Sequence, residues 1–488
     1  MLGVLLGIGP WILGCSAALL CATKPKTSKA DLGIIIMLVG VGGVVSYPFL
    51  GMIIGLFDHF GFVTFRKEYA TVVLVVGLTM LAFALIDMQR IRKTYCNRGH
   101  RPGTASLSMA EILTSAVLIW SMYNTLVSSV LAPIEAWDSF NWMEWAKLYL
   151  DFDQGRYSYE GISRGIGASF PHFHERHPMT IFYVSAYSAF CLGLNPTLQG
   201  WLFPWFFGWV SLALIVWGLG FTCLRSAVGA NCMTYAALTI PLIENHAGQP
   251  GYLDFWIMLI SVAAVASIAK GFELNSLRLK VAGILISFMA LAIKNIGILY
   301  VLSIFSSWVI MELWFWNRFV ICFLPVVPVT VLGFAAYFGF RTSIFGVEIG
   351  FMPMENPIVV FGGYSFSIHW YSPTRILENF YVAFSRNMSF SISALAVIMM
   401  AFVRPPRCNK SHASSINRSK NMCILSSLLL VLIFALPQLI HDYSTIYAEA
   451  GNDTGSSRFL MSFPITVILG VGYYLREADD AYLQGELA

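Results

Sequence analysis

The chain has 488 residues, of which 57% are hydrophobic and only 11% are charged, and its formal net charge at pH 7 is +4. A soluble domain carries roughly 25% charged residues, and the mean hydropathy of this chain is +0.70, so the composition excludes a water-soluble protein. The small net charge gives no indication of nucleic-acid binding. Apolar runs of about 20 residues recur along the chain, each long enough to cross a bilayer as a helix. The sequence therefore predicts an all-α polytopic membrane protein.

The apolar runs predict a bundle of about thirteen transmembrane helices. The first run lacks a basic segment ahead of it, so we expect a first span there rather than a cleaved signal peptide. In chain order the runs lie near residues 1–22, 33–57, 70–88, 109–132, 200–223, 228–245, 252–269, 281–297, 299–316, 319–340, 379–402, 422–441 and 459–475.

This pattern divides the chain into five parts. They are N-terminal helices (1–132), an outer loop with juxtamembrane helices (133–199), a transmembrane core (200–340), a second outer loop that is a candidate lid (341–378), and C-terminal helices (379–488).

Three hydrophilic connections are basic, and the positive-inside rule places them in the cytoplasm. The connections 133–177, 341–378 and 442–458 then fall on the outer face, with the N-terminus outside and the C-terminus inside. The number of spans agrees with these sides only when the weakly apolar segment 178–194 does not cross the membrane. It would then lie along the interface as an amphipathic or re-entrant helix. The basic residues are Lys24, Lys26 and Lys29, then Arg90, Arg92, Lys93, Arg98 and Arg101, then Arg404, Arg407, Lys410, Arg418 and Lys420.

The stretch "EAWDSFNWMEWAKLYLDFDQG", residues 135–155, places acids and tryptophans directly after an apolar run. As a helix it puts Asp138, Trp142, Trp145, Tyr149 and Phe152 on one face. Aromatic residues of this kind anchor a helix at the membrane interface, and Asp138 would then be a helix cap. An acid held where aromatic rings exclude water is also how a general base is positioned. Both interpretations of Asp138 stay open.

Two further outer segments carry polar residues. "FPHFHERHPMTIFY" contains His172, His174 and His177, but the spacing matches no zinc signature, so we predict no metal site there. "ENHAGQPGYLDFW", residues 244–256, is a glycine- and proline-containing turn that ends with Asp254 at the start of a helix. The helix dipole favours an acid at this position, so Asp254 is either a cap or part of a site on the same face as Asp138.

Two cations accompany these acids. Lys294 lies in "LALAIKNIGILY", inside the predicted span 281–297 and roughly two-thirds of the way to its outer end. It either extends its ammonium to the interface or binds an anionic headgroup such as a phosphate. Arg458 begins the last span on the outer face, against the positive-inside bias, and is either an anchor or a phosphate ligand. Two acids and two cations suit glycosyl transfer from a lipid phosphate, because an acid accepts the proton of the acceptor hydroxyl and cations stabilise the leaving phosphate.

At these residues the sequence resembles the GT-C superfamily of membrane glycosyltransferases, particularly the bacterial relatives of protein O-mannosyltransferases and of the aminoarabinose transferase acting on lipid A. "WDSFNWMEWAK" resembles the family's Trp-Asp-Ala segment, "ERHPMTIFY" its His-Pro-x-x-Pro segment and "GYLDFWIML" its Gly-Tyr-Ala-Asp-Leu turn. "AIKNIGILY" is similar to the Thr-Lys-Asn-Glu-Gly-Leu segment, and "SSRFLMSFP" to the arginine-bearing start of a late span. Ile293 and Ile296 stand where the pattern has Thr and Glu, residues 180–183 lack its second proline, and residues 1–108 match nothing in it.

The resemblance implies a GT-C-like bundle that transfers a sugar, with inversion, from a polyprenyl-phosphate donor to a hydroxyl of a glycan, lipid or protein. Asp138 would be the catalytic base, and Asp254 would support it or a metal. Lys294 and Arg458 would bind the donor phosphate. No cofactor is required, although a divalent cation is possible, and the protein would lie in a bacterial inner membrane with its site facing the periplasm or exterior. Further candidates for acceptor or donor binding are Trp137, Asn141, His177, Tyr252, Asn295, His369 and Arg375.

Two other functions fit the same residues. A flippase or transporter for a lipid-linked sugar also needs outward acids, aromatic residues and a phosphate-binding lysine. A polymerase or ligase that uses a diphosphate-linked glycan differs in its leaving group, because it releases polyprenyl diphosphate.

Overall fold

The computed structural model describes residues 2–23, 32–60, 66–96, 108–131, 180–192, 198–248, 251–294, 297–315, 340–344, 347–352, 358–361, 364–367, 381, 384–385, 387–403, 412–435 and 460–485. The chain divides into two compact units. The first contains helices α1 to α11 and the start of α12 up to Ala263, and the second contains the rest of α12 and the elements that follow.

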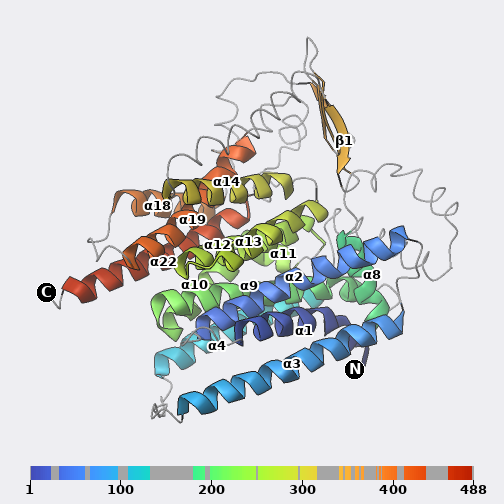
Figure 1. The fold of residues 1–488 in the computed structure, drawn as a ribbon, viewed down its shortest axis with the longest axis horizontal. Helices are drawn as coiled ribbons and strands as arrows, with labels where there is room; N and C mark the ends of the chain where they lie inside the picture. Colours follow the sequence, from blue (N-terminus) through green and yellow to red (C-terminus); the bar gives the residue numbers. More distant parts are fainter. Residues whose placement is uncertain are drawn as a thin grey trace. The chain divides into compact units, whose positions relative to one another are not determined.

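The first unit is a bundle of helices (Figure 1). Within it α1 packs against α2 and α3, α2 packs against α9, and α10 packs against α4 and α9. The α1–α2 contact is close because Gly14 and Gly42 face each other: a Cβ built on Gly42 would lie 2.2 Å from the carbonyl oxygen of Gly14. The helices are α1 (Leu2–Thr23), α2 (Leu32–His59), α3 (Lys67–Cys96), α4 (Met109–Leu131), α8 (Thr180–Leu192), α9 (Leu198–Leu224), α10 (Ala227–Leu238), α11 (Pro241–Gly248) and α12 (Leu253–Glu273).

Tyrosine hydroxyl groups satisfy backbone carbonyls near the proline of α1. Pro10 has no N–H, so the carbonyl of Leu6 loses its usual partner within the helix. Tyr187 of α8 donates its hydroxyl hydrogen to that carbonyl over 3.2 Å. Tyr47 of α2, which is fully buried, donates to the neighbouring carbonyl of Gly7 over 3.1 Å. An apolar helix with an internal proline is thereby held by its neighbours, as membrane helices require.

Helix α8 shows how the predicted interfacial segment 178–194 folds. It has 13 residues, fewer than the roughly 17–25 that a transmembrane helix needs, which agrees with the prediction that this segment does not cross. The amphipathic alternative was wrong, because 11 of its residues are buried, and the re-entrant alternative stays a prediction. Helix α8 has no exposed polar face, because it packs against α1, α2 and α9.

The second unit contains the later helices. Lys280 in the first turns of α13 pairs with Glu312 near the end of α14, so these two helices form an antiparallel hairpin. Lys420 near the start of α19 pairs with Glu477 of α22 at 2.5 Å, so these two are also antiparallel. The elements are α13 (Leu277–Phe288), the 3₁₀ helix η1 (Met289–Ala292), α14 (Gly297–Phe315), α18 (Met388–Phe402), α19 (His412–Ala435) and α22 (Ser462–Gly485).

Two predicted spans are interrupted. The span predicted at 228–245 divides into α10 and α11, because Pro241 starts a new helix and cannot continue the preceding one. The span predicted at 281–297 ends earlier, since α13 gives way to η1 after Phe288. The chain then turns back closely: a Cβ on Gly297 would lie 2.2 Å from the carbonyl oxygen of Ala290.

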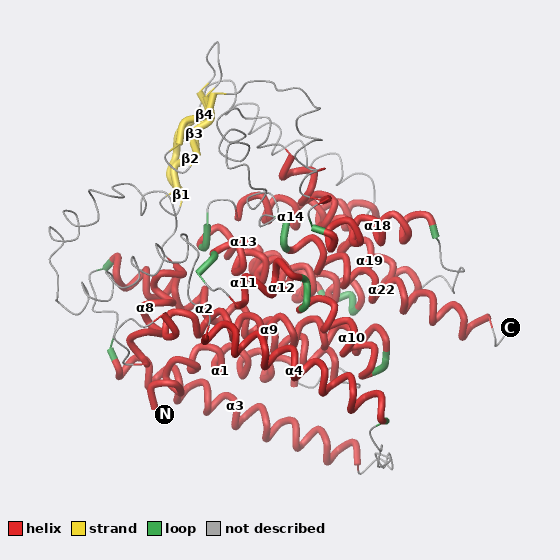
Figure 2. The backbone as a smooth tube through the Cα atoms, turned by 180° about the vertical axis from the view of Figure 1, so that it is seen from behind, coloured by secondary structure: helices red, strands yellow, loops and turns green. Residues whose placement is uncertain are grey.

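Four short strands lie within residues 340–367, in the predicted outer loop (yellow in Figure 2). They form an antiparallel meander in the order β1-β2-β3-β4 and depart from the all-α prediction. Val359 and Val360 are β-branched and follow Pro357, which favours a strand start, and the two-residue Gly362-Gly363 connection suits a hairpin. The strands are β1 (Phe340–Ile344), β2 (Val347–Met352), β3 (Ile358–Phe361) and β4 (Tyr364–Ser367).

Seven of the described helices are long and apolar enough to cross a membrane, which supports a polytopic helical membrane protein. The candidate span of α12, Leu253–Glu273, is buried over its whole window. Parts of the predicted spans 319–340 and 422–441 lie outside the described residues, so the count of about thirteen stays a prediction. The other candidate spans are Leu2–Cys21, Leu32–Asp58, Lys67–Asp87, Met109–Val127, Pro204–Leu224 and Ser415–Ile433.

Candidate functional site

Three of the predicted site residues are described. Tyr252 and Asp254 belong to the first unit, and Lys294 belongs to the second. The remaining predicted site residues lie outside the described residues: Trp137, Asp138, Asn141, His177, Asn295, His369, Arg375 and Arg458.

The turn between α11 and α12 places Asp254 in the first turn of a buried helix. Gly251 within this turn has a φ of 119°, in the region that favours glycine. Asp254 is 1% exposed, so its carboxylate lies inside the protein, near the positive end of the α12 dipole. Such burial suits an acid that holds other groups in place better than one that contacts a ligand directly.

Tyr252 is held from two sides. Its ring lies against the ring of His246, with centroids 4.6 Å apart and planes at 50°. His246 is 6% exposed, and its Nδ1–H donates to the carbonyl of Leu242 over 2.7 Å, which fixes the ring. Trp205 of α9 donates from Nε1 to the carbonyl of Tyr252 over 3.4 Å. Tyr252 is itself partly exposed.

Buried aromatic rings lie beneath the turn. Trp256, two residues beyond Asp254, is fully buried and meets Trp205 edge-on with centroids 6.0 Å apart. Tyr47 of α2 meets Trp256 edge-on from another side at 6.1 Å. These edge-to-face contacts are favourable and rigid. They fix the start of α12, and therefore Asp254, relative to α2 and α9.

Sequence reasoning missed His246, which contacts Tyr252, and Glu244, which contacts Thr125. Both lie in the quoted stretch "ENHAGQPGYLDFW", and their nearness in sequence to Tyr252 and Asp254 was the available signal. Glu244 is half-buried, and Oε1 of its carboxylate accepts a hydrogen bond from Thr125 of α4 at 3.5 Å. A polar contact therefore joins α11 to α4, and aromatic side chains pack beneath the start of α12.

Lys294 lies at the turn of the α13–α14 hairpin. The sequence placed it inside a continuous helix, which was wrong, because α13 and η1 end before it. Its side chain is half-buried, and its carbonyl accepts from the N–H of Gly297 at 2.8 Å, which closes the turn. Lys294 therefore sits at the opposite end of the hairpin from the pair of Lys280 and Glu312. A lysine at a helix boundary carries less desolvation cost than one inside a span.

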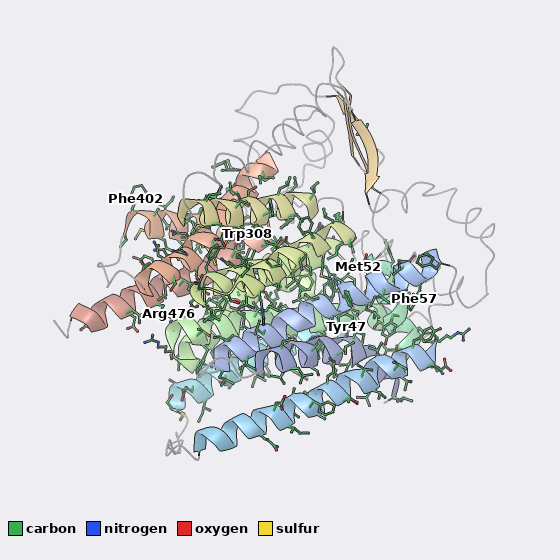
Figure 3. All side chains as sticks on the ribbon, viewed as in Figure 1. Tyr47, Met52, Phe57, Trp308, Phe402 and Arg476 are labelled. Atoms are coloured by element: carbon green, nitrogen blue, oxygen red, sulfur yellow. The ribbon has the colours of Figure 1, made fainter. Side chains whose placement is uncertain are left out.

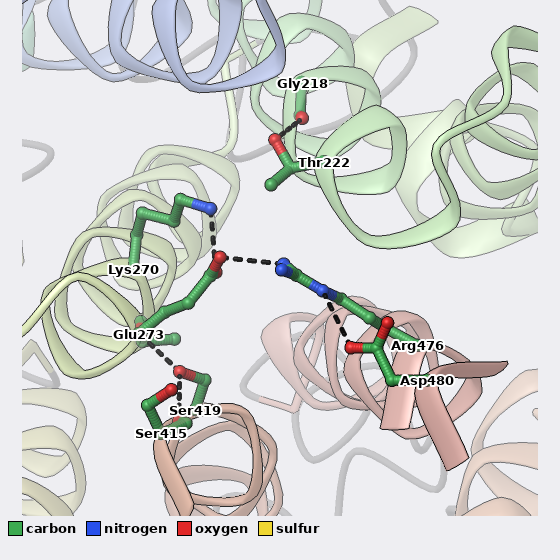
Figure 4. A network of polar contacts seen from close by, with 9 residues as sticks. Gly218, Thr222, Lys270, Glu273, Ser415, Ser419, Arg476 and Asp480 are labelled. Carbon is green, nitrogen blue, oxygen red and sulfur yellow. Dashed lines mark hydrogen bonds and ion pairs between the residues drawn. The ribbon is translucent and has the colours of Figure 1, made fainter. Parts of the chain in front are cut away.

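The second unit also contains a network of buried charges (Figure 4). Glu273 in the last turn of α12 pairs through Oε2 with Lys270 at 2.7 Å and through Oε1 with Arg476 of α22 at 2.7 Å. Asp480 approaches Nε of Arg476 at 3.8 Å. Lys270 is 1% exposed, so its charge depends on Glu273 for compensation.

The pairs formed by Lys280 and Lys420 lie at the same end of the second unit as this network. Lys280 lies over the ring of Phe272 of α12, and Ser419, beside Lys420, bonds to the carbonyl of Ala269, beside Lys270, so the three lysines share one end. These three lysines and Arg476 each face a carboxylate, so the network is a structural clamp and not an anion site.

Within the described residues, no group of three or more His, Cys, Asp and Glu side chains is arranged to hold a metal ion. Most of the predicted site lies outside these residues, so the possibility of a divalent cation stays a prediction.

Comparison of the chain with protein-family models, with curated proteins and with solved structures finds no match. The GT-C resemblance therefore rests on the quoted motifs.

Proposed function

We propose that the protein is a membrane glycosyltransferase that moves a sugar from a polyprenyl-phosphate donor to an acceptor hydroxyl at the outer membrane face. The observation that supports this best is Asp254, which is 1% exposed in the first turn of the fully buried helix α12. Ionisable residues inside membrane spans are costly and are typical of functional sites. The braced and partly exposed Tyr252 beside it adds a surface for a ligand.

The proposed reaction is a single displacement with inversion. Asp138 accepts the proton of the acceptor hydroxyl while the acceptor oxygen attacks the anomeric carbon of the sugar. The bond between that carbon and the phosphate oxygen breaks, and polyprenyl phosphate leaves with the electron pair. Lys294 and Arg458 stabilise the charge on this phosphate. Asp254 acts as a positioning acid, because its burial keeps it from the acceptor.

The remaining parts of the proposal concern binding and placement. Trp137, Asn141, His177, Tyr252 and Asn295 are proposed to contact donor or acceptor. The outer loop 341–378, which contains the four strands, is proposed to cover the site and to offer His369 and Arg375 to the acceptor. The membrane would be a bacterial inner membrane, with the site toward the periplasm or exterior.

The test uses purified protein in lipid nanodiscs with a radiolabelled polyprenyl-phosphate hexose or pentose and a membrane extract as the acceptor source. Acceptor-dependent release of polyprenyl phosphate supports the proposal. Movement of the intact donor across proteoliposomes without bond cleavage identifies a flippase instead. Release of polyprenyl diphosphate from a diphosphate-linked glycan identifies a polymerase or ligase.

A matched pair of variants tests the role of Asp254. Asp254→Asn keeps the shape of the side chain but removes its charge, and we expect transfer to fall by about 10- to 100-fold. Asp479→Asn changes an exposed acid of α22 and should leave transfer unchanged. Equal activity of both variants would reduce Asp254 to a helix cap.

A further inference from the structure

The contact between α12 and α22 in the second unit is made by charged side chains that water hardly reaches. Arg476, labelled on α22 in Figure 3, lies with Nη1 2.7 Å from Oε1 of Glu273, and the two side chains are 9% and 6% exposed. A buried ion pair adds little stability over apolar residues of the same volume, and its best-attested use is to specify or switch an arrangement of helices. Stability alone therefore does not explain this contact.

Each charge in this contact has a second partner on its own helix (Figure 4). Within α12, Lys270 lies three positions before Glu273 and donates to its Oε2 at 2.7 Å. Within α22, Arg476 lies four positions before Asp480, whose Oδ2 is 3.8 Å from Nε. Side chains at these spacings are neighbours on a helix surface. If α12 and α22 separated, Glu273 would keep Lys270 and Arg476 would keep Asp480, so both helices would stay internally compensated.

The contact between α12 and α19 has the same form. The hydroxyl of Ser419 donates to the carbonyl of Ala269 in α12 at 2.7 Å. The same hydroxyl lies 3.1 Å from the carbonyl of Ser415, one turn earlier in its own helix. A serine within a helix commonly bonds to the carbonyl four positions before it. The hydroxyl would therefore stay satisfied if α19 moved away from α12.

Helices α19 and α22 are held to each other in a different way. Lys420 of α19 pairs with Glu477 of α22 at 2.5 Å, with side chains that are 8% and 15% exposed. The ammonium of Lys420 also lies over the ring of Tyr474 of α22, 5.7 Å from its centroid. Separation of these two helices would part a largely buried pair, which is costly. We therefore expect α19 and α22 to move together.

We propose that the junction of α12 with α19 and α22 is a separable latch, which opens when Arg476 exchanges Glu273 for Asp480. Opening lets α19 and α22 move together away from the end of α12 and admits water there. Lys420 belongs to a basic connection, so this end of the second unit is predicted to face the cytoplasm. The inference concerns a motion of the protein and does not rest on the proposed glycosyltransferase function.

Cysteine labelling measures the opening of the latch. Ala269 is fully buried and shares a face of α12 with Glu273, four positions on, so Ala269→Cys in a cysteine-free background reacts only when the latch opens. The rate of reaction with a water-soluble maleimide is measured on the protein in lipid nanodiscs, where both membrane faces are accessible. The same measurement is made with Arg476→Gln, with Asp480→Asn and with the control Asp479→Asn, which changes an exposed neighbouring acid.

The latch predicts opposite effects for the two test variants. Arg476→Gln should speed labelling by about tenfold, because the closed junction loses a charge-assisted hydrogen bond. Asp480→Asn should slow labelling by about threefold, because Arg476 needs this acid more in the open latch, where Glu273 no longer faces it. Asp479→Asn should label at the wild-type rate.

A permanent clamp gives a different sign. Asp480→Asn would then remove one of two acids that hold Arg476 in place, and labelling would be faster or unchanged, either of which overturns the proposal. An unchanged rate in Arg476→Gln would overturn it as well. Thermal unfolding shows whether each variant is folded, and if Arg476→Gln is not, the sign of the change in Asp480→Asn decides alone.

Discussion

Arg476 of α22 donates from Nη1 to Oε1 of Glu273, 2.7 Å away, and so joins the C-terminal helix to the last turn of α12. The second oxygen of the same carboxylate accepts from Lys270 at 2.7 Å. One buried acid therefore compensates two cations from two helices. Ser419 of α19 adds a bond from its hydroxyl to the carbonyl of Ala269 at 2.7 Å, which brings a third helix to this point.

Replacing this acid should destabilise the fold. We expect Glu273→Gln to lower the free energy of unfolding by about 3–5 kcal/mol, because the buried Lys270 loses its carboxylate partner and Arg476 keeps only Asp480, at 3.8 Å. Thermal unfolding in detergent, followed by circular dichroism, measures the effect.

The control is Asp479→Asn, a change of an exposed acid on the same helix as Arg476, for which we expect a change within about 0.5 kcal/mol. The double variant Glu273→Gln with Arg476→Gln should recover part of the loss, because one of the uncompensated charges is removed with its partner. Equal stabilities of Glu273→Gln and Asp479→Asn would show that the network contributes nothing.

The turn ahead of Asp254 gives a second prediction. Gly251 has a φ of 119°, which a residue with a Cβ rarely adopts, so we expect Gly251→Ala to cost about 1–3 kcal/mol and to lower transfer by displacing Asp254. Unfolding and transfer are measured on the same preparation.

Gly470→Ala is the matched control for this turn. Gly470 lies within helix α22, and the atoms nearest to a Cβ on it, from Cys423 and Ile424 of α19, are 3.5 Å away, so alanine fits and should stabilise by about 0.5–1 kcal/mol. If Gly251→Ala were as stable and as active as Gly470→Ala, the turn would not constrain the site.

The sequence predicted the helical membrane class, because the hydropathy of each run is a local property of the chain. The break at Pro241 and the end of α13 before Lys294 were not predicted. A hydropathy window does not separate a continuous span from two helices joined by a turn, since both are apolar. The four strands of the outer loop were missed for a related reason: β propensity depends on cross-strand partners.

The site contacts were the least predictable. Asp254 was found because an acid at a helix start follows from the sequence alone, but the start of its helix is packed by Trp205 of α9 and Tyr47 of α2, which both contact Trp256 and come from distant helices. Glu273 and Arg476 are 203 positions apart, and only the packing of the helices brings them together. Local patterns hold no information about such pairs.

The predicted orientation can be tested by labelling. In a cysteine-free background, Glu68→Cys at the start of α3 should react with a membrane-impermeant maleimide on intact cells, because this end is expected outside. Asp479→Cys near the end of α22 should react only after permeabilisation. Both positions are exposed, so their accessibility is matched. The opposite pattern would invert the topology and place the predicted site in the cytoplasm.

The transfer rate of Asp138→Asn tests the central claim most directly. Asparagine keeps the shape and hydrogen bonding of the side chain but cannot accept the proton of the acceptor, and loss of a general base typically lowers the rate by about 10²- to 10⁴-fold. We therefore predict a folded, membrane-inserted variant that binds the polyprenyl-phosphate donor as the wild type does and transfers no measurable sugar. Near-normal release of polyprenyl phosphate by Asp138→Asn would contradict the account and leave Asp138 as a helix cap.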